Sequence, residues 1–379
     1  MAAPGRLTML ISAERILFPD ADATVAGHLE IEGDRFVAAA PGPAPRPADE
    51  HVDGIVAPGY VDVHSHGGGG ASFVTEDAEE ARTVLATHRR HGVTTMVASL
   101  VTGTVPALKR QVATLAGLVE AGELAGIHLE GPWLALKYKG AHPPLLLSDP
   151  EPDVVAELLA AGRGTVRMAT LAPERPGALE SIRLLVSRGV VAAVGHTDAD
   201  YDTSRAAIEA GARGATHLFN AMAPLRHRDP GPVLALWEDP RVYLELIMDG
   251  VHVRPELVAF VMATEPRRVV LVTDAMAAAG SEDGDYVLGE LPVEVRDGVA
   301  RIAGTETIAG STLTLDRAVR NCVAAGVPLA QAVRAATAVP ADYLGLSDVG
   351  RLAAGTYADL VVLDDDLSVT RVMQHGSWL

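Results

Sequence analysis

Between residue 55 and about residue 275, short apolar runs typical of buried strands alternate with amphipathic stretches of helical period. Such runs predict parallel strands that are covered by helices. Eight runs occur, and eight parallel strands with intervening helices close an α/β (β/α)8 TIM barrel. An open doubly wound sheet is the alternative, but no Gly-x-Gly-x-x-Gly follows the first run. The predicted strands are Ile55–Val63, Thr94–Leu100, Leu124–Leu129, Val166–Leu171, Val190–Val194, Gly214–Thr216, Val242–Ile247 and Val269–Thr273.

Both flanks of this region are different in character. Residues 7–53 contain short β-like segments with a hairpin turn at Gly33-Asp34, and 358–363 and 369–374 are again β-like. Neither flank can easily form a stable sheet alone. We therefore predict a small β-sandwich domain built from both chain termini, 1–54 and 345–379, beside a catalytic barrel spanning 55–344. A further hairpin is expected at 287–302, with Asp297-Gly298 as its turn.

Composition limits the function classes. The 379 residues are 48% hydrophobic and 21% charged, which is typical of a globular protein with a large core. No apolar run reaches the ~20 residues of a membrane span, and Met1–Ser12 is too short for a convincing signal peptide. The single cysteine, Cys322, excludes an intrachain disulfide and favours a cytoplasmic protein. A net charge of −18 argues against nucleic-acid or membrane partners, and an anionic substrate would need local cations.

Histidines and acids stand at the carboxyl ends of the predicted strands, where barrel enzymes carry their chemistry. His64 and His66 are two residues apart on the first strand, so both imidazoles leave the same face. Taken singly, each such residue has an ordinary structural role as a salt-bridge partner or a helix cap. Their joint placement predicts a divalent-metal hydrolase site. The expected ligands are His64, His66, Glu130, His196 and His217.

The remaining polar groups can be sorted by the same reasoning. None of the three lysines stands at a strand exit, so Glu130 is the candidate ligand for bridging two ions. Asp274 is free to act as the general base. His142 and His252 lie in glycine-containing segments after strands and are expected to contact substrate. His128 should be buried beneath Glu130.

The segment Pro58-Gly59 with His64-x-His66, and the closing Gly355–Leu360, resemble the amidohydrolase superfamily. A more specific series, in order along the chain, is similar to the N-acetylglucosamine-6-phosphate deacetylases. Its members are His128-Leu129-Glu130-Gly131-Pro132-Trp133, Lys139-Gly140-Ala141-His142, Gly195-His196-Thr197, His217-Leu218-Phe219-Asn220-Ala221-Met222, Asp249-Gly250-Val251-His252 and Thr273-Asp274-Ala275.

This resemblance implies one or two divalent ions per subunit, most often zinc, with iron, manganese or cobalt as alternatives. It implies that Glu130, His196 and His217 bind the main metal, that Asp274 is the acid/base, and that His142 polarises the acetamide carbonyl. It also implies a homodimer in which the neighbouring subunit helps complete the phosphate pocket. The implied substrate contacts are Ala141, His142, Asn220, Ala221, Arg228, Asp249, His252, Ile308, Ala309 and Gly310.

The implied reaction is hydrolysis of N-acetyl-D-glucosamine 6-phosphate to D-glucosamine 6-phosphate and acetate, in amino-sugar catabolism or cell-wall recycling. Arg228 would supply the local cation that a phosphate needs against the acidic background. Some relatives lack the His64-x-His66 pair, so its presence here predicts a second metal position. Two rivals remain, namely an amidohydrolase acting on N-acyl amino acids or cyclic amides, and a non-enzymatic scaffold on the same fold.

Overall fold

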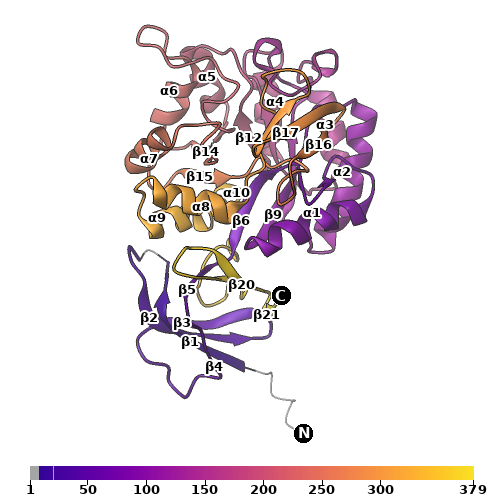
Figure 1. Cartoon of the computed structure of the whole chain (residues 1–379). Helices are drawn as coiled ribbons and strands as arrows, with labels where there is room; N and C mark the ends of the chain where they lie inside the picture. The colour runs from indigo at the N-terminus through magenta and orange to yellow at the C-terminus, as the bar shows by residue number, and fades with distance from the viewer. Residues whose placement is uncertain (1–7, 20) are drawn as a thin grey trace.

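The computed structural model describes residues 8–19 and 21–379 as a barrel standing on a smaller sheet (Figure 1). Residues 1–7 and 20, which belong to the predicted amino-terminal flank, lie outside the described residues. Within the described part of the chain, the structure contains no helix long and apolar enough to cross a membrane.

Eight parallel strands form the barrel, in the order in which they occur along the chain. The last strand returns to the first, because the Asp274 amide donates to the His64 carbonyl at 2.8 Å and the His66 amide donates to the Ala275 carbonyl at 2.7 Å. The predicted (β/α)8 barrel is therefore confirmed and the open sheet is excluded. The strands are β6 (Tyr60–Ser65), β9 (Val93–Leu100), β10 (Gly126–Glu130), β11 (Val166–Leu171), β12 (Val191–Val194), β13 (Gly214–Ala215), β14 (Tyr243–Ile247) and β15 (Val269–Val272).

Helices surround this barrel and bury one face each against it. Their starts follow from local sequence: the Asp77 and Asp200 side chains accept hydrogen bonds from backbone amides of the first turns of α1 and α5, and α3 and α7 begin at proline. The helices are α1 (Ala78–Arg90), α2 (Val105–Glu120), α3 (Pro152–Ala161), α4 (Ala178–Ser187), α5 (Tyr201–Glu209), α6 (Gly231–Glu238), α7 (Pro255–Thr264), α8 (Leu315–Ala324), α9 (Leu329–Ala335) and α10 (Ala338–Leu344).

Strands from both ends of the chain form one second sheet, in the order β21-β20-β19-β5-β1-β2-β3, with β4 also paired to β1. It encloses a separate apolar core that includes Ile11, Leu29, Phe36 and Leu360. The small β domain built from both termini is therefore confirmed. Its strands are β1 (Thr8–Ile16), β2 (Val25–Glu32), β3 (Arg35–Pro41), β4 (Glu50–His51), β5 (Ile55–Pro58), β19 (Leu360–Leu363), β20 (Val369–Gln374) and β21 (Ser377–Trp378).

The first predicted barrel strand is divided between the two sheets. The prediction of one strand over 55–63 was wrong in this respect: β5 pairs with β1 and β19 in the terminal sheet, and only β6 enters the barrel. The chain changes sheets at Gly59, where a Cβ atom would lie 2.2 Å from the Thr94 Oγ1 atom. Glycine is thus required at the point where the two parts of the molecule meet.

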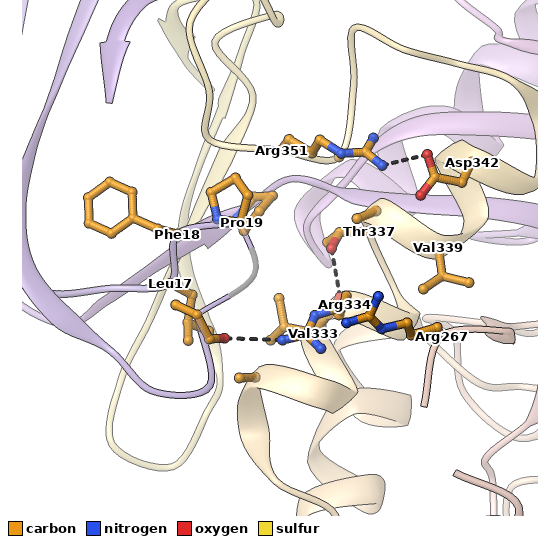
Figure 2. A pocket seen from close by; sticks show the side chains of 15 residues that line it. Leu17, Phe18, Pro19, Arg267, Val333, Arg334, Thr337, Val339, Asp342 and Arg351 are labelled. Atoms are coloured by element: carbon orange, nitrogen blue, oxygen red, sulfur yellow. Dashed lines mark hydrogen bonds and ion pairs between the residues drawn. The ribbon is translucent and has the colours of Figure 1, made fainter. Parts of the chain in front are cut away.

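A pocket of about 200 Å³ lies at this junction, between the loop after β1 and helices α9 and α10 (Figure 2). Arg334 crosses it by donating to the Ala21 carbonyl at 3.1 Å, and Arg351 pairs with Asp342 at 2.5 Å. These contacts fix the barrel on the terminal sheet at the end opposite to the strand exits.

An antiparallel insertion follows the eighth barrel strand. It consists of β16 (Gly284–Leu288), β17 (Leu291–Arg296) and β18 (Val299–Ile302), so the predicted hairpin is confirmed and gains one strand. Its turn has positive φ at Asp297 and Gly298, 52° and 72°, as a type I′ hairpin requires. The insertion packs on Val101, Ala141 and Met276. This packing brings Leu288 to the mouth of the barrel.

Candidate metal and substrate site

The strand exits turn sharply to direct their side chains inward. His196, His217, Ala221 and Asp274 have positive φ values of 48°, 31°, 48° and 47°. Non-glycine residues rarely adopt this region, and each instance costs on the order of 1–3 kcal/mol. The surrounding backbone hydrogen bonds hold them there, since the Ser311 amide donates to the Asp274 carbonyl at 2.7 Å.

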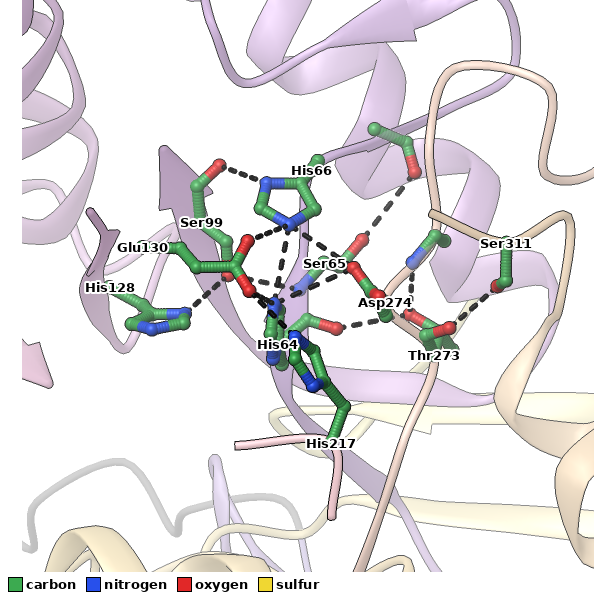
Figure 3. Close-up of polar contacts among 12 residues, drawn as sticks. His64, Ser65, His66, Ser99, His128, Glu130, His217, Thr273, Asp274 and Ser311 are labelled. Carbon is green, nitrogen blue, oxygen red and sulfur yellow. Dashed lines mark hydrogen bonds and ion pairs between the residues drawn. The ribbon is translucent and has the colours of Figure 1, made fainter. Parts of the chain in front are cut away.

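Glu130 stands at the centre of the predicted ligands (Figure 3). Its Oε1 atom lies 3.0 Å from His217 Nε2, 3.2 Å from His196 Nε2 and 3.5 Å from His64 Nε2. Its Oε2 atom lies 3.1 Å from His66 Nε2. All five side chains are at least 94% buried. The structure therefore brings together every side chain expected to bind metal.

The hydrogen-bond partner of the ring nitrogen that points away from the centre, here called the far nitrogen, determines whether the nitrogen facing the centre carries a proton or a lone pair. His66 Nδ1 lies 3.1 Å from the Ser99 carbonyl and His196 Nδ1 lies 2.9 Å from the Tyr138 carbonyl. A carbonyl only accepts, so both Nδ1 atoms carry the proton and both Nε2 atoms present a lone pair to the centre. His64 Nδ1 lies 3.0 Å from a carboxylate oxygen of Glu245, with the same consequence.

This donor set fits a divalent cation. His196 and His217 approach each other Nε2 to Nε2 at 3.0 Å, and His64 and His66 do so at 3.2 Å. Two lone pairs at such a distance repel unless a cation or a proton lies near both. Imidazole and carboxylate groups are typical ligands of zinc and related metals, and His64, His66 and His196 also have the hydrogen-bonded far nitrogen common in such ligands, whereas the Nδ1 atom of His217 has no partner among the described residues. Glu130 stands between the two pairs, as a bridging ligand would.

The pKa values of the two carboxyl groups at this centre are shifted by the imidazoles that surround them. Burial opposes the shift, yet the surrounding imidazoles of His64, His196 and His217 hold the pKa of Glu130 well below its usual range. Burial likewise opposes the shift at Asp274, whose pKa is lowered mainly by His64 and His66. Both carboxyl groups are therefore anionic, as a cation requires.

His142 differs from the other histidines at this centre. Its Nδ1 atom accepts from the Thr102 amide at 3.3 Å and lies 2.8 Å from the Thr102 hydroxyl. The proton of the neutral ring must then sit on Nε2, which lies 3.7 Å from Glu130 Oε2. Burial and the neighbouring His196 lower the pKa of His142 to about 3. It is a neutral hydrogen-bond donor facing the centre.

Asp274 closes the group on the side of the eighth strand. Its Oδ1 atom lies 3.2 Å from His66 Nε2 and 3.5 Å from His64 Nε2. Beneath the cluster, His128 is fully buried between Ser99 and Thr170, as expected. Within the described part of the chain, the polar contacts of Asp274 Oδ1 are with the imidazoles of His64 and His66 alone.

A cavity of about 360 Å³ opens above these groups. Most of the predicted substrate contacts line it, and Asp249 holds His252 from behind through a bond of 2.6 Å to Nδ1. Ala309 is buried behind the wall, and Arg228 lies exposed on the 223–230 loop outside the lining. The predicted residues in the lining are Ala141, His142, Asn220, Ala221, His252, Ile308 and Gly310.

Sequence reasoning missed other residues of this site. The cavity is also lined by Lys137 and Tyr138 from a single 3-10 turn, by Leu288 at the end of β16 and by Glu306, none of which had been singled out in the sequence. Glu245 supports His64 from the middle of β14, where an acid within the apolar run Tyr243–Ile247 was the available signal. A charged residue inside a buried strand needs a partner and could have been singled out on that ground.

A closed barrel that gathers histidines and carboxylates around one centre at its strand exits defines a hydrolase that works with a divalent metal. A model of the amidohydrolase family matches residues 55–379, and the chain belongs to this family. Most of the chain is also similar to curated deacetylases of amino-sugar phosphates.

The N-acetylglucosamine-6-phosphate deacetylase of Homo sapiens is 39% identical over 353 residues, covering 87% of this chain and 85% of that protein. The N-acetylgalactosamine-6-phosphate deacetylase of Escherichia coli O157:H7 is 39% identical over 347 residues, covering 90% and 92%. A Mycobacterium smegmatis N-acetyl-D-glucosamine-6-phosphate deacetylase, solved as a variant in complex with N-acetyl-D-glucosamine-6-phosphate, is 52% identical with a TM-score of 0.95, covering 98% and 99%. The resemblance to the N-acetylglucosamine-6-phosphate deacetylases is confirmed.

Proposed function

We propose that this protein is a metal-dependent hydrolase that converts N-acetyl-D-glucosamine 6-phosphate to D-glucosamine 6-phosphate and acetate. The observation that carries the proposal is the cavity lined by Glu130, His196 and His217 together with Asp274 and a neutral His142. Relatives at 35–39% identity bear the name of this enzyme and are matched over most of this chain.

Two side chains perform the proton chemistry in this proposal. A divalent metal held by Glu130, His196 and His217 supplies Lewis-acid activation of water and of the carbonyl when it is bound. His142 donates a hydrogen bond from its Nε2–H to the acetyl oxygen, where negative charge develops, and keeps its proton. Asp274 accepts a proton from the attacking water and delivers it to the amine nitrogen as the C–N bond breaks.

The phosphate needs a cation that reaches the cavity. Among the described residues that line it, Lys137 is the single lysine or arginine, and its ammonium lies 2.8 Å from Asp198. His252 can add charge, since Asp249, against the effect of burial, raises the pKa of its imidazole. We propose that Lys137 and His252 bind the phosphate, and that Arg228 does so from the 223–230 loop.

A second candidate substrate is N-acetyl-D-galactosamine 6-phosphate. The observation in its favour is the E. coli relative named for that substrate, at the same 39% identity as the human relative. The two sugars differ only in the configuration of one hydroxyl group. They would share the acetamide chemistry and the phosphate contacts.

A substrate comparison tests the proposal. Acetate release should be measured from both phosphorylated sugars and from unphosphorylated N-acetylglucosamine, each with the zinc-loaded enzyme. We expect kcat/KM for N-acetyl-D-glucosamine 6-phosphate to exceed that for the free sugar by at least about 100-fold, since the contacts from Lys137 and His252 are each worth about 1.5–3 kcal/mol. Equal rates for the two would refute the phosphate requirement, and preference for the galactose epimer would select the second candidate.

Other features complete the proposal. Zinc is the expected metal, because histidine and carboxylate ligands suit it and it is commonly available, and His64 with His66 forms a second position bridged by Glu130. The catalytic unit is proposed to begin at Tyr60 rather than at residue 55, because β5 belongs to the terminal sheet, and to end at residue 344. The protein is proposed to act in the cytoplasm as a homodimer.

A further inference from the structure

Glu245 is a fully buried acid inside the barrel. It lies in the middle of β14, and its side chain is 0% exposed. A carboxylate in such surroundings is strongly unfavourable unless hydrogen bonds and charges compensate it. Glu245 does not line the substrate cavity. Its role has to be sought in the groups that it touches.

Those groups belong to both halves of the metal cluster. Oε2 of Glu245 lies 3.0 Å from His64 Nδ1 and accepts from the His217 amide at 3.4 Å. Oε1 accepts from the Tyr343 hydroxyl at 3.3 Å. The carboxylate is thus anchored by Tyr343 on α10 and directed at His64.

We infer that Glu245 is the positioning residue of the His64/His66 metal position. As an acceptor it keeps the proton of His64 on Nδ1, which leaves the Nε2 lone pair facing Glu130. The neighbouring His66 has a neutral carbonyl, that of Ser99, in the equivalent place. The negative charge behind His64 makes its Nε2 a stronger donor to a cation, which favours occupancy of this position.

The test compares metal binding by the purified full chain and by Glu245→Gln. The amide keeps the size of the side chain and can still accept a hydrogen bond, but it carries no charge. Metal-free protein is titrated with zinc against a chromophoric chelator, and bound zinc is counted. Wild-type protein should bind two ions. In Glu245→Gln one of them should bind about 10- to 100-fold more weakly, and the other should keep its affinity within about threefold.

A matched control separates this role from general destabilisation. Asp316 is another buried acid, on α8, paired with His91 and Arg320 away from the cluster. Asp316→Asn should lower the melting temperature and leave both zinc affinities unchanged. Equal loss of zinc affinity in both variants would overturn the inference, as would two unchanged affinities in Glu245→Gln.

A second measurement needs no variant. In metal-free wild-type protein, the ¹⁵N chemical shifts of the His64 ring should report a proton on Nδ1, and a proton on Nε2 alone would overturn the inference. Neither readout uses the sugar substrate. A protein that binds zinc as described but does not release acetate would disprove the proposed function and leave the role of Glu245 intact.

Discussion

Replacement of Asp274 by asparagine removes the proposed proton carrier with little change of shape. The side chain is 11% exposed, and its Oδ1 atom lies 3.2 Å from His66 Nε2. An amide cannot take the proton from water, and general acid–base catalysis contributes about 10²- to 10⁴-fold. We therefore expect kcat to fall by that factor, which corresponds to about 3–5 kcal/mol of barrier. KM should stay within about threefold, since binding does not require the proton transfer.

The assay is single-turnover and steady-state release of acetate, with zinc content measured on the same samples. Glu306→Gln is the matched control, because Glu306 also lines the cavity but its side chain is fully exposed. This control should change kcat by less than about threefold, as expected for a solvated charge. Turnover of Asp274→Asn within tenfold of wild type, at equal zinc content, would refute the reasoning.

Three further outcomes are expected. Lys137→Met should raise KM for the phosphorylated sugar by about tenfold or more and leave kcat nearly unchanged. The matched Lys139→Met should not change KM, because Lys139 lies outside the cavity lining. Steady-state kinetics on the phosphorylated and the free sugar would show this. Asp249 raises the pKa of His252 against the effect of burial. The stabilisation from this pair is therefore fully present below pH values of about 6.5, the ordinary histidine pKa, and is lost as pH rises through the raised pKa. In Asp249→Asn the midpoint of the NMR titration of His252 should move to lower pH, and an unchanged midpoint would contradict the assignment. Chelation of the metal should lower the melting temperature reversibly. The loss is equivalent to about 2.7 kcal/mol for each ion removed, if free zinc was at about 100 times the dissociation constant of that site. Scanning calorimetry with and without added zinc measures this.

The fold was predictable because its signal is repeated. Apolar runs at regular spacing specify buried parallel strands whatever the details of any one run, and all eight were found with ends displaced by a few residues. The division at Gly59 was not predictable in this way. Ile55–Pro58 and Tyr60–Ser65 are both fully buried and are separated by a single residue, and only the pairing of β5 with β19 assigns the first of them to the terminal sheet.

The site was predictable where side-chain type and strand position coincide. His64, His66 and Glu130 were expected at the centre and are found there. Which ring nitrogen of a histidine carries the proton was not predictable. His142 and His196 are both histidines after strands, yet Nδ1 of the first faces a backbone amide and Nδ1 of the second a carbonyl, so the first presents an N–H and the second a lone pair to the centre.

The shared terminal sheet has a consequence for synthesis on the ribosome. β5 leads directly into the strand that carries His64, but one of its two partners, β19, follows about 300 residues later. At about 5–20 residues per second, the nascent chain spends about 15–60 s with that edge unpaired. Exposed strand edges recruit other chains. Cellular yield should therefore depend on chaperone supply during translation, and a permuted gene that places 345–379 before residue 8 should relieve that dependence.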